Sequence, residues 1–146
     1  MEPHKLSDDF TVSPQIDPAD IATLAQMGFR TLINNRPDAE VPDSHSSDVM
    51  AEHAAAAGLA YHYLPYFPGM MTPELIAAYE DVMAEAETPA FAYCRSGTRS
   101  SHLWGIDQAG RMPVAQILEA AAQAGYDHAP LVPLIEMHAA NRKATG

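Results

Sequence analysis

The sequence has 146 residues, 47% of them hydrophobic, and 8 Lys and Arg against 19 Asp and Glu give it a formal net charge of −11. Nucleic acids and anionic lipid surfaces are bound by clustered Lys and Arg side chains, so this charge argues against both as partners. The single cysteine, Cys94, excludes an internal disulfide and a site with several thiolate ligands. Length and apolar content predict one domain, residues 1–146, with one core.

The hydropathy pattern predicts a soluble protein of the cytoplasm. Residues 1–10, MEPHKLSDDF, contain no apolar leader segment. No apolar run approaches the roughly 20 residues that a membrane helix needs. A lone thiol also fits a reducing compartment.

Strands and helices are predicted to alternate through the first half of the chain. An edge strand is expected within residues 10–16, FTVSPQI, ending near Pro14. Asp17 and Pro18 are typical of a helix start and Gly28 of a helix stop. The elements that follow are a buried strand over 30–34, a loop over 35–47, a helix over 48–57 and a strand over 59–64.

The second half continues the alternation. Thr72 and the apolar spacing after it predict a helix over 73–87, and the apolar run 89–93 predicts a strand that leads directly to Cys94. Three helices are expected after it, over 101–109, 113–124 and 130–141. This order predicts an α/β fold with a central, mostly parallel sheet flanked by helices. Ligands bind at the carboxyl ends of such strands, where Cys94 lies.

Residues 94–100, CRSGTRS, join the last strand to a helix and have the composition of an anion-binding loop. Backbone N–H groups of such a loop, together with the helix dipole, attract an anion, and Gly97 permits the required backbone turn. A buried structural thiol would be the ordinary interpretation of Cys94, but two arginines and three hydroxyl residues make a poor core segment. We therefore predict Cys94 as a nucleophile whose thiolate the loop stabilises.

The other residues of the loop are predicted to bind the substrate. Arg99 and Arg95 would orient an anion, and a hydroxyl of Ser96 or Ser100 could donate a hydrogen bond to the thiolate. The predicted catalytic residues are thus Cys94 and Arg99, and the predicted substrate-binding residues are Arg95, Ser96, Gly97, Thr98 and Ser100. The seven histidines show no metal-binding spacing, so neither a metal nor a cofactor is expected.

Three stretches of the chain resemble known families. Residues 94–99, CRSGTR, are similar to the C-R-x-G-x-R loop of the rhodanese sulfurtransferases. The segments TLINNRPD at 31–38, YHYLPY at 61–66 and AFAYC at 90–94 resemble the dual-specificity branch of the protein tyrosine phosphatases. Together, about residues 8–125 look like the bacterial family called beta-lactamase hydrolase-like protein, phosphatase-like domain. That resemblance implies a tyrosine-phosphatase-type α/β fold, and members of the family are associated both with phosphatase-like naming and with sulfane-sulfur metabolism.

Loop spacing favours sulfur transfer over phosphate-ester hydrolysis. The tyrosine-phosphatase signature has its arginine six positions after the cysteine, whereas Arg99 comes five positions after Cys94, and segment 65–72 holds no carboxylic acid to protonate a leaving oxygen. A thiolate attacking thiosulfate, a polysulfide or a persulfide needs no strong acid. We expect a Cys94 persulfide, with a small anionic sulfur donor and a thiol acceptor such as glutathione, or cyanide, as partners. Oligomeric state is left open.

Two alternatives stay open. A phosphatase acting through a Cys94 phosphocysteine would need a proton donor from elsewhere, for which Asp38 and Glu40 are the candidates. A non-catalytic module that binds an anion or a phosphorylated partner would leave Cys94 unexplained. Charge is unevenly placed in either case, because residues 89–118 hold three arginines and one aspartate, a balance of +2, so the remainder carries −13.

Overall fold

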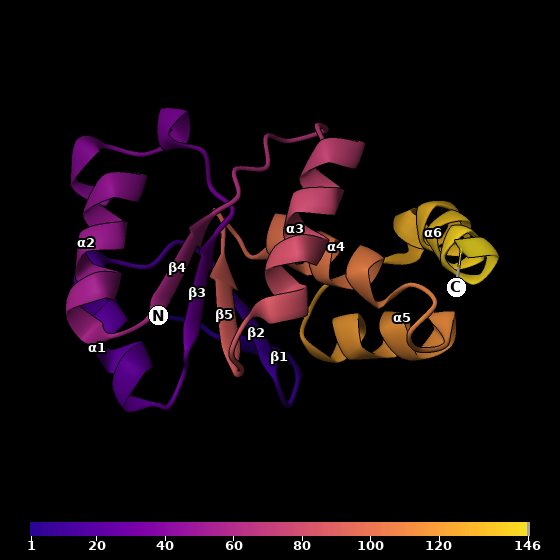
Figure 1. The fold of residues 1–146 in the computed structure, drawn as a ribbon, viewed down its shortest axis with the longest axis horizontal. Helices are drawn as coiled ribbons and strands as arrows, with labels where there is room; N and C mark the ends of the chain where they lie inside the picture. Colours follow the sequence, from indigo (N-terminus) through magenta and orange to yellow (C-terminus); the bar gives the residue numbers. More distant parts are fainter. Residues whose placement is uncertain (146) are drawn as a thin grey trace.

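The computed structural model describes residues 1–145 and contains a five-stranded sheet in the order β1-β2-β5-β3-β4 (Figure 1). The strands are β1 (His4–Ser7), β2 (Phe10–Ser13), β3 (Thr31–Asn34), β4 (Ala60–Tyr63) and β5 (Ala90–Tyr93). β1 pairs with β2 in antiparallel fashion, and the other three pairings are parallel. The predicted α/β class with a mostly parallel sheet is confirmed.

The predicted position of one strand in the sheet is wrong. β2 was expected at the edge of the sheet, but it lies between β5 and β1, and all four of its residues are buried. β1 forms the edge instead. Its four residues, HKLS, bury only Leu6 fully, so they show no apolar run from which a strand could be predicted.

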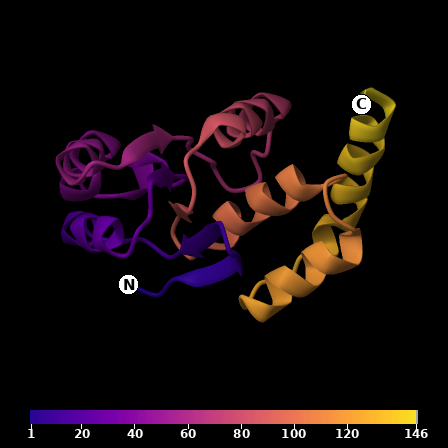
Figure 2. The ribbon, with the colours of Figure 1, turned by 60° about the horizontal axis from the view of Figure 1, so that its bottom comes forward.

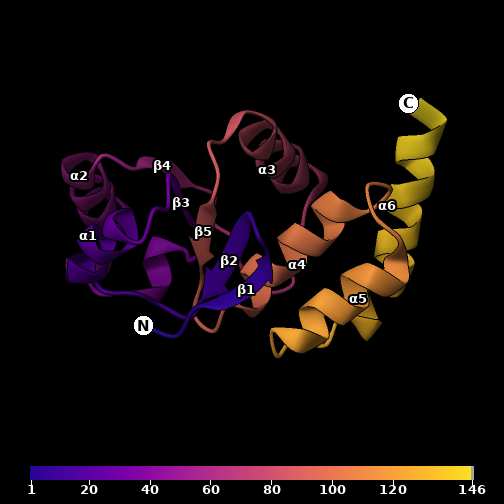
Figure 3. The same ribbon diagram turned by 90° about the horizontal axis from the view of Figure 1, so that it is seen from below.

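Residues 1–145 form six α-helices, four of which pack on the sheet (Figures 1 and 2). They are α1 (Pro18–Gln26), α2 (Ser47–Ala57), α3 (Pro73–Glu85), α4 (Thr98–Gln108), α5 (Val114–Gln123) and α6 (Val132–Thr145). α1 and α2 cover one face, α3 and α4 cover the other, and α5 and α6 lie beyond α4, as the view from below shows (Figure 3). None of the helices in residues 1–145 is long and apolar enough to cross a bilayer.

Alternation along the strands divides the core into two clusters. Leu32, Phe91 and Tyr93 point toward α1 and α2, whereas Ile33 and Ala92 point toward α3 and α4. This two-sided burial explains why the central strands consist of short, nearly continuous apolar runs. It also fixes where each strand ends, and therefore which residues meet at the carboxyl edge of the sheet.

Most helix boundaries agree with prediction within a few residues; α6 ends four residues after the predicted 141, and the difference that bears on the site lies at α4. This helix begins at Thr98, three residues before the expected start, with Gly97 as its N-cap in the left-handed region at φ 88°. The helix N-terminus therefore belongs to the segment 94–100 itself. The predicted loop 35–47 contains two short 3-10 helices, Asp38–Glu40 and Asp43–His45.

Candidate active site

Four strands end at one place, beside Cys94. Cys94 follows β5, and its N–H donates to the carbonyl of Ser13 at the end of β2 at 3.3 Å. Asn35 follows β3, and its N–H donates to the carbonyl of Tyr93 at 2.8 Å. The chain after β4 is fixed by the N–H of Tyr66, which donates to the carbonyl of Asn35 at 2.9 Å. The carboxyl edge of the sheet is thus a framework of backbone hydrogen bonds around Cys94.

Cys94 is fully buried at the base of the loop. The backbone N–H of Gly97 donates to its Sγ at 3.1 Å, a contact that stabilises negative charge on sulfur. Gly97 adopts φ 88° and ψ −15°, which a residue with a side chain rarely does. α4 starts at the next residue, so the positive end of its dipole points into the same loop.

Arg99 is held by a carboxylate that lies 59 residues away in sequence. Its Nη2 donates to Glu40 Oε1 at 2.7 Å and its Nη1 donates to Glu40 Oε2 at 2.9 Å, a two-pronged ion pair. Nη1 also donates to the carbonyl of Tyr66 at 2.7 Å. Within residues 1–145 these contacts leave the Nε–H and one Nη2–H of Arg99, which form one edge of the guanidinium. That edge is a fork suited to two oxygens of a tetrahedral anion.

A second arginine supports Glu40. Arg36 Nε lies 3.4 Å from Glu40 Oε1, its Nη2 donates to the Glu40 carbonyl at 3.0 Å, and its Nη1 donates to Gln15 Oε1 at 3.1 Å. The hydrogen bond from Arg99 is the main cause that lowers the pKa of Glu40, with further lowering from Arg36. The hydrogen bond with Glu40 likewise raises the pKa of Arg99, to which the charges of Cys94 and Tyr66 add. Glu40 is therefore a fixed anion at neutral pH.

Neither predicted acid is placed as a proton donor. Glu40 is ionised and shared between Arg99 and Arg36. Asp38 faces the start of α2, where its Oδ1 accepts the backbone N–H of Ser47 at 2.7 Å. The structure thus assigns Glu40 to orienting Arg99 and Asp38 to capping a helix.

The remaining predicted site residues lie around the loop in different ways. Ser100 is buried, but its Oγ donates to Asn35 Oδ1 at 2.8 Å, so its hydroxyl does not serve the thiolate as proposed above. Ser96 is exposed, and its Oγ donates to Thr98 Oγ1 at 2.9 Å. Arg95 is also exposed, and within residues 1–145 its side chain makes no hydrogen bond or ion pair. Arg99 is accordingly the better placed of the two predicted anion-binding arginines.

Three residues from other segments complete the surroundings of the loop. Asn35 joins Ser100 to the chain after β4, because its Nδ2 donates to the carbonyl of Leu64 at 2.9 Å. Tyr66 lies beside Arg99 and Cys94. Tyr126, from the segment after α5, donates its hydroxyl to the carbonyl of Ser96 at 3.2 Å. These contacts join distant segments, and no local spacing in the sequence indicates them.

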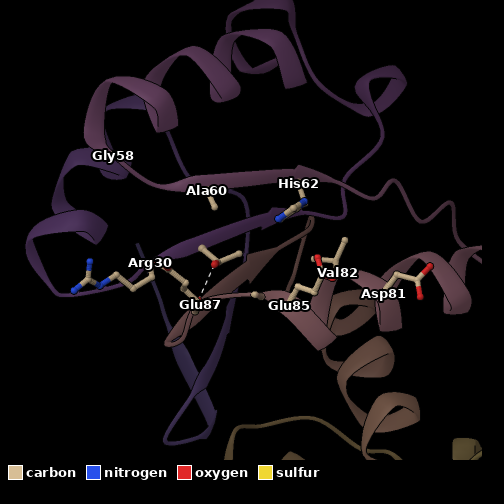
Figure 4. A pocket seen from close by; sticks show the side chains of 10 residues that line it. Arg30, Gly58, Ala60, His62, Asp81, Val82, Glu85 and Glu87 are labelled. Carbon is tan, nitrogen blue, oxygen red and sulfur yellow. Dashed lines mark hydrogen bonds between the residues drawn. The ribbon is translucent and has the colours of Figure 1, made fainter.

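A separate cavity of about 520 Å³ opens at the opposite end of the strands (Figure 4). It lies where β3 and β4 begin and where the chain enters β5, with Arg30, His62, Asp81 and Glu85 among its walls. Two of its lining residues are joined by a hydrogen bond, which Thr31 Oγ1 donates to the carbonyl of Glu87 at 2.7 Å. This cavity does not include Cys94. Within residues 1–145 no three His, Cys, Asp or Glu side chains lie close enough together to hold a metal ion.

The model of the family described as beta-lactamase hydrolase-like protein, phosphatase-like domain, matches residues 4–111. The chain belongs to this family. A beta-lactamase hydrolase-like protein of Agrobacterium fabrum is 33% identical over 87% of this chain, and one from Xylella fastidiosa strain 9a5c is 29% identical over 92%. The chain spans only 30% and 32% of these two relatives, about a third of their length.

Solved structures place this phosphatase-like domain among proteins of tyrosine-phosphatase-like fold. A candidate phosphatase from Neisseria meningitidis Z2491 has 32% identity and a TM-score of 0.78, over 94% of this chain and 99% of that one. The core catalytic domain of the PP-IP phosphatase SIW14 from S. cerevisiae has 18% identity and a TM-score of 0.68, over 99% and 91%. The second likeness concerns the fold alone.

These comparisons revise the functional interpretation of the phosphatase-like domain. The predicted fold and family are confirmed. The preference for sulfur transfer, which rested on the spacing of the loop and on the missing acid in segment 65–72, is not supported by the family or by the 32% identical structure, and phosphatase chemistry agrees with them better.

Proposed function

We propose that the protein is a cysteine-dependent phosphatase that hydrolyses a phosphomonoester through a phosphocysteine on Cys94. The observation that carries this proposal is the Arg99 guanidinium, which Glu40 holds by one end while a two-donor edge stays available beside the Cys94 loop. The 32% identical candidate phosphatase of the same fold supports the same chemistry.

The first step would use the groups that converge on Sγ. The Cys94 thiolate attacks phosphorus, the S–P bond forms and the bond from phosphorus to the leaving oxygen breaks. Backbone N–H groups of the loop and the free edge of Arg99 would bind the three remaining phosphoryl oxygens. In the second step a water attacks phosphorus and the S–P bond breaks, which regenerates the thiolate and releases inorganic phosphate carrying the protons of that water.

The leaving oxygen must take its proton from water, because Glu40 and Asp38 are engaged elsewhere. Unassisted departure favours a leaving group that is stable as an anion. We therefore expect aryl phosphates with acidic phenols to be hydrolysed much faster than alkyl phosphates. A phosphatase with a positioned acid would show little dependence on the leaving group.

Sulfur transfer is the second candidate, and two observations favour it. The arginine stands five positions after the cysteine, and neither of the two candidate acids, Asp38 and Glu40, is placed to protonate a leaving group. A thiolate that accepts sulfane sulfur would use the same loop amides, since a persulfide is also an anion stabilised by N–H donors.

One preparation tests both candidates. Hydrolysis of an aryl phosphate and thiosulfate-dependent formation of thiocyanate are measured side by side, with Cys94→Ser as the blank. Cys94-dependent release of phosphate without sulfur transfer is the expected result. Thiocyanate formation without phosphate release would replace the proposal by the second candidate. Equal anion binding by wild type and Cys94→Ser, with no turnover in either assay, would indicate a binding module.

A further inference from the structure

The end of α5 is built to return the chain to the Cys94 loop. Gly125 has φ 96°, its N–H donates to the Ala122 carbonyl at 3.0 Å, and the N–H of Tyr126 donates to the Ala121 carbonyl at 2.8 Å. This pair of bonds is the Schellman arrangement, which ends a helix and reverses the chain. Tyr126 is therefore set in place by backbone geometry, and it lies outside the segment 4–111 that defines the family.

Tyr126 is wedged against the loop. Its hydroxyl donates to the Ser96 carbonyl at 3.2 Å, and its ring meets the ring of His4 on β1 edge-on, with centroids 5.7 Å apart. A Cβ added at Gly97 would collide with Tyr126 Oη. The absence of a side chain at Gly97 thus permits both its positive φ and the close approach of the tyrosine.

Tyr126 and Cys94 contact opposite ends of one peptide unit. The carbonyl of the Ser96–Gly97 peptide accepts the Tyr126 hydroxyl, and the N–H of the same peptide donates to Cys94 Sγ at 3.1 Å. In a planar trans peptide the C=O and N–H point in opposite directions. A hydrogen bond that holds the carbonyl outward therefore keeps the N–H directed inward at sulfur.

We propose that Tyr126 is a positioning residue for the nucleophile: it locks the Ser96–Gly97 peptide in the orientation that directs the Gly97 N–H at Cys94 Sγ. This inference rests on Cys94 being the nucleophile and applies to phosphate and sulfur chemistry alike. Gly97 is the position at which such a lock is needed, because glycine allows the neighbouring peptide to flip at low cost.

The ionisation state of Tyr126 is compatible with this role. Burial is the first cause that raises the pKa of Tyr126, the charge of Cys94 is the second, and together they bring it to about 12. The hydroxyl therefore keeps its proton, and can donate to Ser96, over the whole range in which an enzyme of this kind works.

Tyr126→Phe removes the hydroxyl and leaves the ring. Thiolate absorbance near 240 nm is recorded from pH 5 to 9 as the difference between each protein and its Cys94→Ser counterpart. Loss of this one hydrogen bond is expected to raise the pH at which half of the thiolate absorbance has appeared by about 0.5 to 1 unit. We expect kcat/KM for the aryl phosphate to fall about 3- to 10-fold, with the melting temperature little changed.

Tyr79→Phe is the matched control, because the Tyr79 hydroxyl is buried and has no hydrogen-bond partner within residues 1–145. It should reproduce the wild-type pH profile. Gly125→Ala, which disturbs the placement of Tyr126 without removing its hydroxyl, should shift the profile in the same direction as Tyr126→Phe.

The outcomes separate this inference from the proposed function. If the wild type shows thiolate absorbance below pH 8 and Tyr126→Phe has the same pH profile of that absorbance, Tyr126 is not a positioning residue, whereas Cys94 stays the nucleophile. A wild-type protein without thiolate absorbance below pH 8 would overturn Cys94 as an activated nucleophile and, with it, the lock. An equal shift in Tyr79→Phe would also contradict the lock, because the effect would then be general.

Discussion

The polar groups on and beside the two halves of α4 differ in whether their charges are paired. At its first turn, Arg99 is ionised and shares Glu40 with Arg36. In the second half of α4, the buried Asp107 Oδ1 has no hydrogen-bond partner within residues 1–145, and neither do two buried atoms of other elements that lie nearby, His128 Nδ1 against Gly105 and Tyr79 Oη on α3.

Their pKa shifts follow the same division. At the first turn, ion pairing lowers the pKa of Glu40 and raises that of Arg99, so both charges are kept. In the second half, burial raises the pKa of Asp107 and lowers that of His128 to about 4, so burial favours the neutral form of each. The first arrangement stabilises charge beside Cys94, whereas in the second, burial disfavours the charged form of each group.

This contrast distinguishes a binding site from a structural one. Charged groups that are oriented by several partners are costly to assemble and are found where an anion must be bound. Groups whose charged form is disfavoured by burial make stability depend on pH. Substitutions in the first half of α4 should therefore change activity first, and those in the second half should change stability first.

Cys94→Ser should give the largest effect of all. Serine is nearly isosteric but remains a neutral alcohol, so the covalent step is lost and turnover should fall at least about 10³-fold. Circular dichroism and the melting temperature should stay close to wild type. Residual turnover within tenfold of wild type would exclude Cys94 as the nucleophile.

Glu40→Gln should come next, because it removes the charge that orients Arg99. One end of the guanidinium loses its two-pronged partner, and we expect kcat/KM to fall about 10- to 100-fold through misplacement of the anion-binding edge. The free energy of unfolding should fall by about 1 to 3 kcal/mol. Glu80→Gln is the control, since Glu80 pairs with Arg142 at 3.4 Å away from the loop, and it should leave turnover unchanged. Equal losses in both variants would contradict the orienting role.

The fold could be predicted from local patterns because those patterns are set by burial on two faces of one sheet. Short apolar runs and proline or glycine boundaries located β3, β4, β5 and the start of α3, and they placed Cys94 at the carboxyl edge. β1 could not be found in this way, because its outer position leaves it mostly polar.

The partners of the loop could not be predicted for a different reason. Arg99 and Glu40 are 59 residues apart, and Tyr126 and Ser96 are 30 apart, so each pair exists only after the helices have packed. Glu40 was named as a candidate proton donor, whereas in the structure it holds Arg99 in place. Its role follows from the side chain it meets, which periodicity does not determine.

His128, which follows α5 and packs against Ser101 and Gly105 of α4, should make stability depend on pH. Burial, followed by the neighbouring His102, lowers the pKa of His128 to about 4, while Asp127 opposes the shift. Between this pKa and the ordinary value of about 6.5, the unfolded chain binds a proton at His128 that the folded chain does not bind. The free energy of unfolding is therefore highest above about pH 6.5 and falls as the pH drops toward 4, by on the order of 2 kcal/mol. Urea unfolding at pH 7.5, 5.5 and 4.5 measures this loss.

His128→Gln isolates that contribution. The Ser101 hydroxyl lies 3.1 Å from His128 Nε2, and a glutamine amide can replace this contact without titrating. The variant should lose stability at pH 7.5 but show a flatter dependence between pH 6.5 and 4 than wild type. His53→Gln, which changes an exposed histidine, should keep the wild-type slope. An unaltered slope in His128→Gln would show that other groups cause the acid sensitivity.

Asp107→Asn should give the smallest effect and the opposite sign. Burial raises the pKa of Asp107 more than Arg111, 3.9 Å away, lowers it, so ionised Asp107 is less stable in the folded chain than in the unfolded one. Its contribution is lost as the pH rises from about 3.8 through the folded value. Asparagine should therefore stabilise the protein at pH 7 by up to about 1 kcal/mol and give no gain below pH 3.8, as measured by urea unfolding. Asp81→Asn, an exposed carboxylate on α3, should show no such pattern. A loss of stability in Asp107→Asn at pH 7 would mean that the folded protein stabilises the ionised Asp107 carboxylate, as it does that of Glu40. The groups at the two halves of α4 would then not differ in how burial acts on their charged forms.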